Sequence, residues 1–319
     1  MSRIQQRFEQ MLAPAGIQIN GSNPWDVQVH NPDLFLRIAR DGTLGLGEAY
    51  MDGWWDCEAL DEMITRGFRA GLEDQVRNNF RFLIYLIGFR LFNRQSRARA
   101  FQVGEQHYDI GNDVFEQMLD PHMNYSCGFW ESASDLDEAQ IAKMEMICAK
   151  LQLEPGMKVL DIGCGWGGLA RWMAQHHDVH VTGVTVSVEQ AKLAQERCAD
   201  LPVEITVKDY RELEGKFDRI VSVGMFEHVG QRNYGTFFTK SRSLLKDQGL
   251  FLLHTIGAGR DGFATDRWIE KYIFPNGVLP PAAALARQAG ACFTIEDWHN
   301  FGADYDPTLM AWYRNFNAA

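Results

Sequence analysis

The chain has 319 residues, of which 46% are hydrophobic, and a formal net charge of −11. This composition excludes a disordered chain, and the length suits two domains. The acidic balance argues against a protein that binds nucleic acid over its whole surface, because such proteins need a cationic face to displace counterions.

The N-terminal residues 1–16 are polar and carry charges of both signs, so they lack the apolar stretch of a signal peptide. The longest apolar run, residues 82–89, is far shorter than the roughly 20 residues that cross a bilayer as a helix. The six cysteines show no paired spacing for a disulfide framework or a zinc site. We therefore expect a cytoplasmic protein with reduced thiols and no membrane-spanning helix.

Residues 1–95 mix strand-like stretches, at 27–30 and 34–38, with helical ones, and aromatic residues gather around Trp54. We interpret this region as a smaller N-terminal α+β domain that associates with lipid or membrane. This interpretation rests on the C-terminal part of the region. From Arg66 to Arg99 there are eight arginines and only two acidic residues, interleaved with Phe, Leu and Ile. This composition suits either peripheral contact with an anionic lipid surface or an ordinary docking helix followed by a solvated linker.

A polar, arginine-rich stretch at residues 96–106 is the predicted linker, and residues 107–319 are the predicted catalytic domain. Strands and helices alternate there, which predicts an α/β fold with a Rossmann-like doubly wound sheet. The expected strands are 158–162, 179–184, 203–207, 217–223 and 249–254, and the expected helices are 168–177, 188–198 and 232–245.

A glycine-rich turn follows the first of these strands and opens a helix, from Asp161 through Gly163 and Gly165 to Gly168. Glycines suit a nucleotide-like ligand that approaches the backbone closely, but the spacing also fits dinucleotide cofactors. A nicotinamide enzyme would carry an acidic residue at the end of the second strand, where Thr185 stands instead. Asp161 and Asp209 match positions typical of class I methyltransferases, which favours S-adenosylmethionine.

Six blocks of sequence resemble the cyclopropane-fatty-acyl-phospholipid synthases, and the resemblance covers essentially the whole chain. Besides the glycine turn, they are HYDIGND at 107–113, YSC at 125–127, VGMFEHVG at 223–230, YIFPNG at 272–277 and WHNFGADY at 298–305. The resemblance implies an S-adenosylmethionine-dependent enzyme that converts the cis double bond of unsaturated phospholipid acyl chains into a cyclopropane ring. It also suggests a homodimer.

The resemblance implies two sets of site residues. Those expected to bind S-adenosylmethionine are Tyr125 and Ser126 at its methionine end, Gly163 and Gly165 along its middle, Thr185 and Gln190 at its ribose, and Asp209 and Tyr210 at its adenine, together with Asp161 just before the glycine turn. Those expected to hold a bicarbonate ion, which would accept the proton, are Cys127, Glu227, His254, Tyr305 and the backbone of Ile256.

The residues themselves add a partial argument for the second set. Glu227 follows the fourth predicted strand and His254 ends the fifth, so both lie at the carboxyl edge of the sheet, where doubly wound folds bind their ligands. Glu227 could be a direct base, or it could orient His254 or a bound bicarbonate. Cys127 suits an anion-holding role better than a covalent nucleophile, since the chemistry needs no acyl-enzyme intermediate.

A carbocation formed on an alkene needs a dry, aromatic pocket, for which Phe129, Trp130, Phe226, Tyr272 and Phe274 are candidates beside a core-packing role. His176, His177 and His180 are expected on the surface, and no metal site is predicted. Relatives of this type continue beyond Tyr313 by several tens of residues, so we expect a shortened C-terminus. Two alternatives remain: another lipid or small-molecule methyltransferase, and a lipid-binding protein with a vestigial site.

Overall fold

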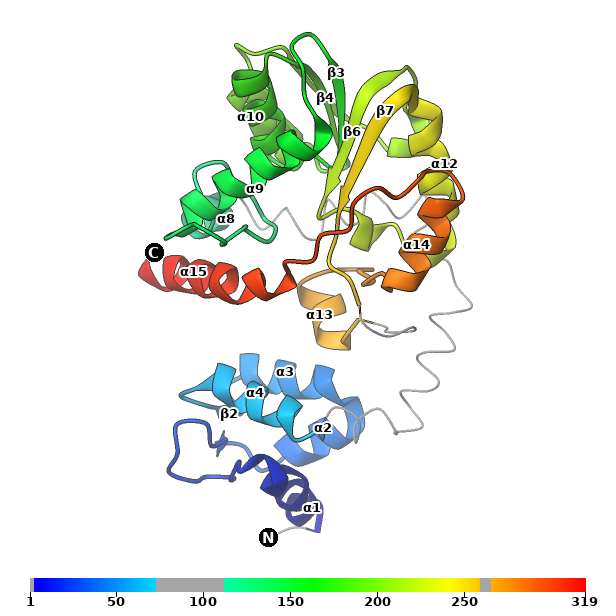
Figure 1. The fold of residues 1–319 in the computed structure, drawn as a ribbon. Helices are drawn as coiled ribbons and strands as arrows, with labels where there is room; N and C mark the ends of the chain where they lie inside the picture. Colours follow the sequence, from blue (N-terminus) through cyan, green and yellow to red (C-terminus); the bar gives the residue numbers. More distant parts are fainter. Residues whose placement is uncertain (1–2, 73–111, 259–264) are drawn as a thin grey trace. The chain divides into compact units, whose positions relative to one another are not determined.

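The computed structural model describes residues 3–72, 112–258 and 265–319, which divide into two units (Figure 1). The N-terminal unit holds residues 3–72 together with the later segment 265–273. The catalytic unit holds residues 112–258 and 274–319. The predicted linker at 96–106 lies outside the described residues, as does the basic segment beyond Arg69.

Short helices surround a small antiparallel ribbon in the N-terminal unit. The strands are β1 (Gln28–Val29) and β2 (Trp55–Asp56), and the helices are α1 (Arg3–Leu12), α2 (Leu34–Asp41), α3 (Thr43–Met51) and α4 (Leu60–Arg69). Leu34, Ala49, Trp55 and Cys57 form the buried centre of this unit. Because helices and a ribbon share one core, the expected α+β character is confirmed for the described part.

The strand predicted at residues 34–38 is wrong, because these residues begin helix α2. Leu34 and Phe35 are buried and Ile38 packs against the same core, whereas Leu36 is 60% exposed. This burial follows a helical period and not the alternation of a half-buried strand.

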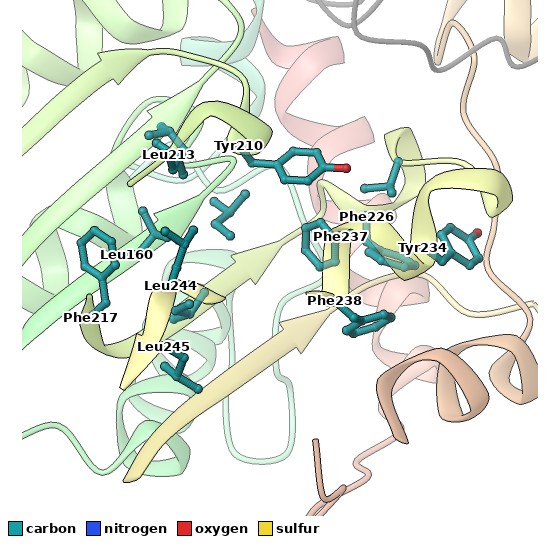
Figure 2. Close-up of a cluster of buried hydrophobic side chains, with 14 of the residues drawn as sticks. Leu160, Tyr210, Leu213, Phe217, Phe226, Tyr234, Phe237, Phe238, Leu244 and Leu245 are labelled. Atoms are coloured by element: carbon teal, nitrogen blue, oxygen red, sulfur yellow. The ribbon is translucent and has the colours of Figure 1, made fainter. Parts of the chain in front are cut away.

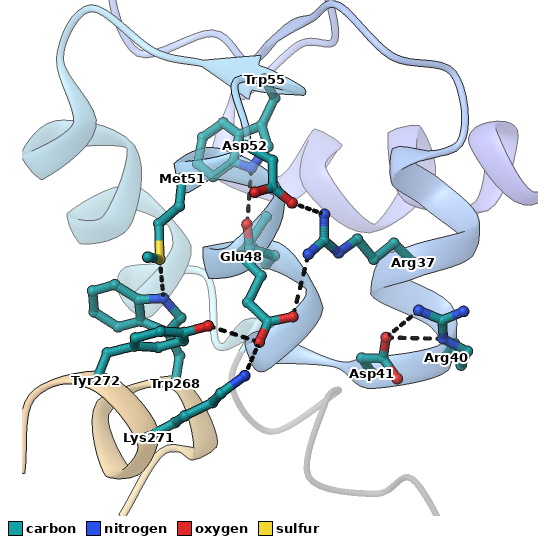
Figure 3. A network of polar contacts seen from close by, with 11 residues as sticks. Arg37, Arg40, Asp41, Glu48, Met51, Asp52, Trp55, Trp268, Lys271 and Tyr272 are labelled. Carbon is teal, nitrogen blue, oxygen red and sulfur yellow. Dashed lines mark hydrogen bonds and ion pairs between the residues drawn. The ribbon is translucent and has the colours of Figure 1, made fainter.

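Helix α13 (Arg267–Tyr272) comes from the second half of the chain but belongs to the N-terminal unit. Figure 3 shows the contact: Oε1 of Glu48 accepts hydrogen bonds from Lys271 Nζ at 2.6 Å and Tyr272 Oη at 3.0 Å. Its Oε2 accepts a bond from Arg37 at 3.2 Å. The indole of Trp268 covers Gly47 so closely that a Cβ there would lie 2.3 Å from the ring.

These contacts explain why a segment that the sequence analysis placed in the catalytic domain groups with the N-terminal unit. The ion pair with Lys271 lowers the pKa of Glu48 to about 2. The partly buried indole of Trp268 and the charged hydrogen bonds together hold α13 on α3.

A five-stranded parallel sheet lies at the centre of the catalytic unit, with strand order β5-β4-β3-β6-β7. The chain runs outward from β3 on one side and then returns to start β6 on the other, so the topology switches between β3 and β6. The strands are β3 (Lys158–Ile162), β4 (His180–Thr185), β5 (Val203–Val207), β6 (Phe217–Val223) and β7 (Leu245–His254). The predicted doubly wound fold is confirmed, and its switch point is where such folds bind ligands.

Helices cover both faces of the sheet because alternate strand residues point in opposite directions. Val159, Val181 and Val221 pack against α9 (Leu136–Leu151) and α10 (Gly168–His177). Leu160 and Ile220 face the other way, toward Phe237 and Phe238 of α12 (Tyr234–Leu244), as Figure 2 shows for part of this cluster. The remaining helices of the unit are α8 (Asn112–Met118), α11 (Val188–Arg197), α14 (Ala282–Gly290) and α15 (Tyr305–Ala318).

Two predicted boundaries in the catalytic unit differ from the structure by more than one residue. A 3-10 turn at Gln231–Asn233 precedes α12, which starts at Tyr234 and not at residue 232. Strand β7 begins at Leu245, four residues before the predicted start, because Leu245 already pairs with Phe217 before a register shift. Among the described helices, none combines the length and apolarity needed to cross a bilayer.

Candidate active site

The glycine turn is shaped by close backbone approaches. Gly163 has φ +89°, and a Cβ there would lie 2.6 Å from Cβ of Met225. Its N–H donates to the carbonyl of Val184 at 2.8 Å, which fixes the turn against β4. Gly168 begins α10 directly beneath the carbonyl of His122, where a Cβ would come within 2.0 Å of the oxygen. Glycine is therefore required on both sides of the turn, and the turn lies at the switch point of the sheet.

One pocket opens at this edge of the sheet, and all nine residues predicted to bind the cofactor line it. They come from the segment before α9, from the ends of β3, β4 and β5, from the glycine turn and from the first turn of α11. Other residues also line the pocket: Met225, His228 and Asn276 belong to the quoted sequence blocks, whereas Lys143 was not singled out by the sequence analysis. A site gathered from several strand ends is typical of a nucleotide-like ligand in a doubly wound fold.

The polar groups of the pocket differ in how they are satisfied. Thr185 Oγ1 donates to Gln190 Oε1 at 3.0 Å, and the carboxylate of Asp209 pairs with Arg211 at 3.0 Å. Asp161 is buried, and its Oδ2 has no hydrogen-bond partner among the described residues. Burial raises the pKa of Asp161 to about 7. An acid of this kind suits a ligand that carries its own hydrogen-bond donors, as the amino and ribose groups of S-adenosylmethionine do.

Tyr125 gives the pocket an aromatic wall. Its ring lies 5.4 Å from that of Phe115, 5.1 Å from that of Trp312 and 6.2 Å from that of Phe274. The face of an aromatic ring attracts a cation, so this wall suits a sulfonium group.

Beside the pocket lies a second group of side chains, which we call the buried cluster: Cys127, Glu227, His254 and Tyr305. Cys127 and Glu227 are buried, whereas His254 and Tyr305 are partly buried, with Nδ1 of His254 shielded from solvent. Cys127 directly follows the pocket residue Ser126, and the N–H of Gly224, another pocket residue, donates to the carbonyl of His254 at 3.0 Å. The backbone of Phe301 lies 3.9 Å from the thiol of Cys127, and its ring lies 5.1 Å from the imidazole of His254. The structure thus brings together residues from four distant parts of the chain.

The backbone N–H of Ile256 donates to Oε1 of Glu227 at 2.6 Å, so this predicted anion ligand already has a partner. The other oxygen of Glu227, Oε2, and Nδ1 of His254 have no hydrogen-bond partner among the described residues. Buried polar atoms are usually paired, so these two atoms indicate that a further polar group completes the cluster.

Burial disfavours charge on every member of the cluster. It raises the pKa of Cys127 to about 11, raises that of Glu227, and raises that of Tyr305, with smaller contributions from Glu227 and Cys127. It lowers the pKa of His254 to about 3. A neutral thiol is a poor nucleophile, which supports the expectation that Cys127 holds a ligand and does not attack one.

Lys143 is the residue of this site that the sequence analysis missed. It lies on the buried face of α9 with Leu136, Gln140, Met144 and Ile147. The signal was present, because a lysine and a glutamine at interior positions of an apolar helical face are rarely buried without a role.

Several residues considered in the sequence analysis lie outside both the cofactor pocket and the buried cluster. Phe226 is fully buried in the core shown in Figure 2, so the aromatic-pocket hypothesis is wrong for this residue. Tyr272 bonds to Glu48 within the N-terminal unit. His176 stacks on Trp172, with ring centroids 3.8 Å apart. Within the described ranges, no three His, Cys, Asp or Glu side chains gather as metal ligands would.

Comparison with known proteins gives consistent matches. The family model described as "Mycolic acid cyclopropane synthetase" matches residues 95–319. The cyclopropane-fatty-acyl-phospholipid synthase of Escherichia coli strain K12 is 58% identical over 310 residues, covering 97% of this chain and 81% of that protein. The tuberculostearic acid methyltransferase of Mycobacterium tuberculosis is 33% identical and covers 90% of this chain and 72% of that protein. The mycolic acid cyclopropane synthase CmaA1, crystallised with SAH and CTAB, has a TM-score of 0.64 at 34% identity, with 68% and 83% covered.

Proposed function

This chain belongs to the mycolic acid cyclopropane synthetase family and is an S-adenosylmethionine-dependent methyltransferase, and from that premise we propose that it is a cyclopropane-fatty-acyl-phospholipid synthase. Its acceptor is the cis double bond of an unsaturated phospholipid acyl chain. The observation that carries the proposal is the adjacency of two sites: a pocket lined by every residue expected to bind the cofactor, and the buried cluster beside it.

When bound, S-adenosylmethionine supplies a methyl group on a positively charged sulfur. The chain's own contribution is to hold the donor at the switch point of the sheet and to keep water from the reacting carbons. Transfer of the methyl to one alkene carbon leaves a cation on the other, and loss of one methyl proton closes the ring. Orientation of this kind can contribute roughly 7–11 kcal/mol to lowering a barrier, which a weak nucleophile such as an alkene requires.

The proton leaves through the buried cluster. Cys127, Glu227, His254 and Tyr305 suit a small anion with several hydrogen-bonding atoms, because Oε2 of Glu227 and Nδ1 of His254 are buried without a partner among the described residues. Bicarbonate would supply there a base that accepts the proton. In this proposal Ile256 acts indirectly, since its N–H fixes the Glu227 carboxylate.

The lipid substrate implies contact with a membrane, which we propose occurs peripherally, at the inner face, through the segment from Arg66 to Arg99. The sequence supports this, because positive charge and apolar side chains alternate there in an otherwise acidic chain. Only Arg66 and Arg69 of this segment lie in the described part, at the end of α4. A homodimer is part of the same proposal.

The test is to incubate the protein with S-adenosylmethionine and vesicles of unsaturated phospholipid, then to analyse the acyl chains by mass spectrometry and proton NMR. We expect each modified chain to gain one CH₂ and to show the upfield protons of a cyclopropane ring. Vesicles of saturated phospholipid are the control and should remain unmodified. Absence of a ring in the unsaturated phospholipid would reject the proposal.

A second function is favoured by one comparison, namely the similarity to a tuberculostearic acid methyltransferase. An enzyme of that kind would add the methyl carbon without closing a ring, and in this assay, which contains no reductant, loss of a proton from the cation would leave a methylene-branched or methyl-substituted alkene. The same experiment separates the two, because such a product shows vinyl protons in the NMR spectrum and no upfield ring protons. A vestigial site would bind no S-adenosylmethionine, which calorimetry reports directly.

A further inference from the structure

Lys143 is a buried lysine that forms no ion pair with any of the described residues. Its side chain is 1% exposed, and its Nζ donates to Ser126 Oγ at 2.7 Å and to Gln140 Oε1 at 2.6 Å. Both acceptors are neutral, although a lysine ammonium is a positive charge with three donors. Taking such a charge out of water is strongly unfavourable unless an anion compensates it.

Among the described residues, no carboxylate contacts the ammonium directly, and the nearby Asp120 compensates its charge only in part. No ion pair joins Lys143 to a carboxylate there, and the charged or titratable groups that influence it are Asp120, Cys127 and His254. Asp120 is committed elsewhere: it accepts bonds from the backbone of His122 at 2.9 Å and of Asn124 at 2.7 Å. Cys127 and His254 are neutral, as shown above. Burial therefore lowers the pKa of Lys143, to about 8.

The position of Lys143 connects the two sites. It lines the cofactor pocket beside Ser126. Burial has the largest effect on the pKa values of Cys127 and His254 in the buried cluster, and the positive charge of Lys143 acts to lower both. Of the lysine and arginine side chains that line the pocket, Lys208 and Arg211 lie next to Asp209, at the end expected to hold the adenine. Lys143 lies instead at the end expected to hold the methionine part of the cofactor.

We propose that the ammonium of Lys143 is the counter-charge for a carboxylate-class anion that binds where the pocket meets the buried cluster. Two sources have this chemistry: the amino-acid carboxylate of S-adenosylmethionine and bicarbonate. Identifying these ligands rests on the proposed function, but the role of Lys143 follows from its position in the pocket wall and from a buried ammonium that has no ion-pair partner among the described residues.

A purely structural role explains the contacts less well. Gln140 Nε2 already donates to the carbonyl of Ser126 at 2.9 Å, which holds the 125–127 segment against α9 without help from a charge. A structural lysine would therefore be replaceable by an apolar side chain of similar length, with no effect on anion binding.

The test compares Lys143→Met with wild type, using Lys150→Met as the control, because Lys150 lies on the same helix, is 30% exposed and pairs with Asp297 away from the pocket. Calorimetry measures affinity for S-adenosylmethionine and for its decarboxylated analogue, without any acyl acceptor. In parallel, the line width of ¹³C-bicarbonate in NMR titrations measures anion binding to each protein. Thermal unfolding checks folding, and Lys143→Gln replaces the methionine variant if that variant does not fold.

If the cofactor carboxylate is the partner, Lys143→Met weakens S-adenosylmethionine binding by about tenfold or more and leaves binding of the decarboxylated analogue nearly unchanged. If bicarbonate is the partner, the cofactor affinity is unchanged and the bicarbonate broadening is lost. Unchanged values for both ligands, relative to Lys150→Met, would overturn the proposal. Because no lipid is involved, a wild-type protein that forms no cyclopropane would refute the proposed function and leave this result interpretable.

Discussion

The cofactor pocket and the buried cluster are neighbours that differ in how far their polar groups bond to one another. In the pocket, Thr185 bonds to Gln190 and Asp209 to Arg211, so that part of the site is preformed, and Asp161 Oδ2 is left for the ligand. In the cluster, Glu227 and His254 each keep a buried atom without a partner among the described residues, and burial favours the neutral forms of both. The difference indicates that the pocket is the more preformed of the two, whereas the cluster depends more on a ligand to complete its hydrogen bonds.

The largest expected effect separates the two regions by function. Glu227→Gln should lower turnover by about a hundredfold or more, because it removes the carboxylate that orients the proton-accepting groups. Affinity for S-adenosylhomocysteine should not change, since Glu227 does not line the pocket. Steady-state kinetics and calorimetry measure the two quantities, with the exposed Glu204→Gln as the control. A variant that loses cofactor affinity to the same degree would show that the two regions are one site.

The next effect tests whether the pocket is preformed. Gly163→Ala should weaken S-adenosylhomocysteine binding by about tenfold or more, because its Cβ would meet Met225 and force the turn to move. Gly156→Ala is the matched control: it has a similar positive φ, but no atom lies within 4 Å of the added Cβ. Both variants should lose about 1 kcal/mol of unfolding free energy through backbone strain. Equal cofactor affinities in calorimetry would contradict a preformed turn.

The smallest expected effect concerns stability and should involve neither the cofactor pocket nor the buried cluster. Glu48→Gln in the N-terminal unit should lower the unfolding free energy by about 1–2 kcal/mol at neutral pH, because it weakens the bonds to Lys271 and Arg37. The contribution is modest because the Lys271 side chain is 53% exposed. Cofactor affinity should stay the same, and urea unfolding measures the stability.

The stabilisation by Glu48 should depend on pH, and the direction follows from its lowered pKa. The pKa of Glu48 is lowered in the folded protein to about 2, from 4.5. The stabilisation is therefore fully present above about pH 4.5 and is lost as the pH falls from there toward 2. The difference in stability between wild type and Glu48→Gln should shrink over that window. A difference that stays constant with pH would mean that the charge of Glu48 does not stabilise α13.

The sequence alone determined the parts of this protein that depend on short-range patterns. The glycine turn after β3 was predictable because its glycines and Asp161 are consecutive and their backbone requirements are local. The sheet strands were predictable because buried parallel strands form short apolar runs between helices. Residues 34–38 were predicted wrongly because five apolar-rich residues fit either a strand or a helix, and only contact with the core at Leu34 and Phe35 decides.

Tertiary structure decided what depends on burial and on distant partners. The helical pattern places Lys143 on the apolar face of α9, but its complete burial follows only from the packing of α9 against the sheet. No local sequence pattern predicts that α13 joins the N-terminal unit, because Glu48 and Lys271 are more than 200 residues apart in the chain. Desolvation and long-range contacts set the charges of buried groups, and these exist only in the folded protein.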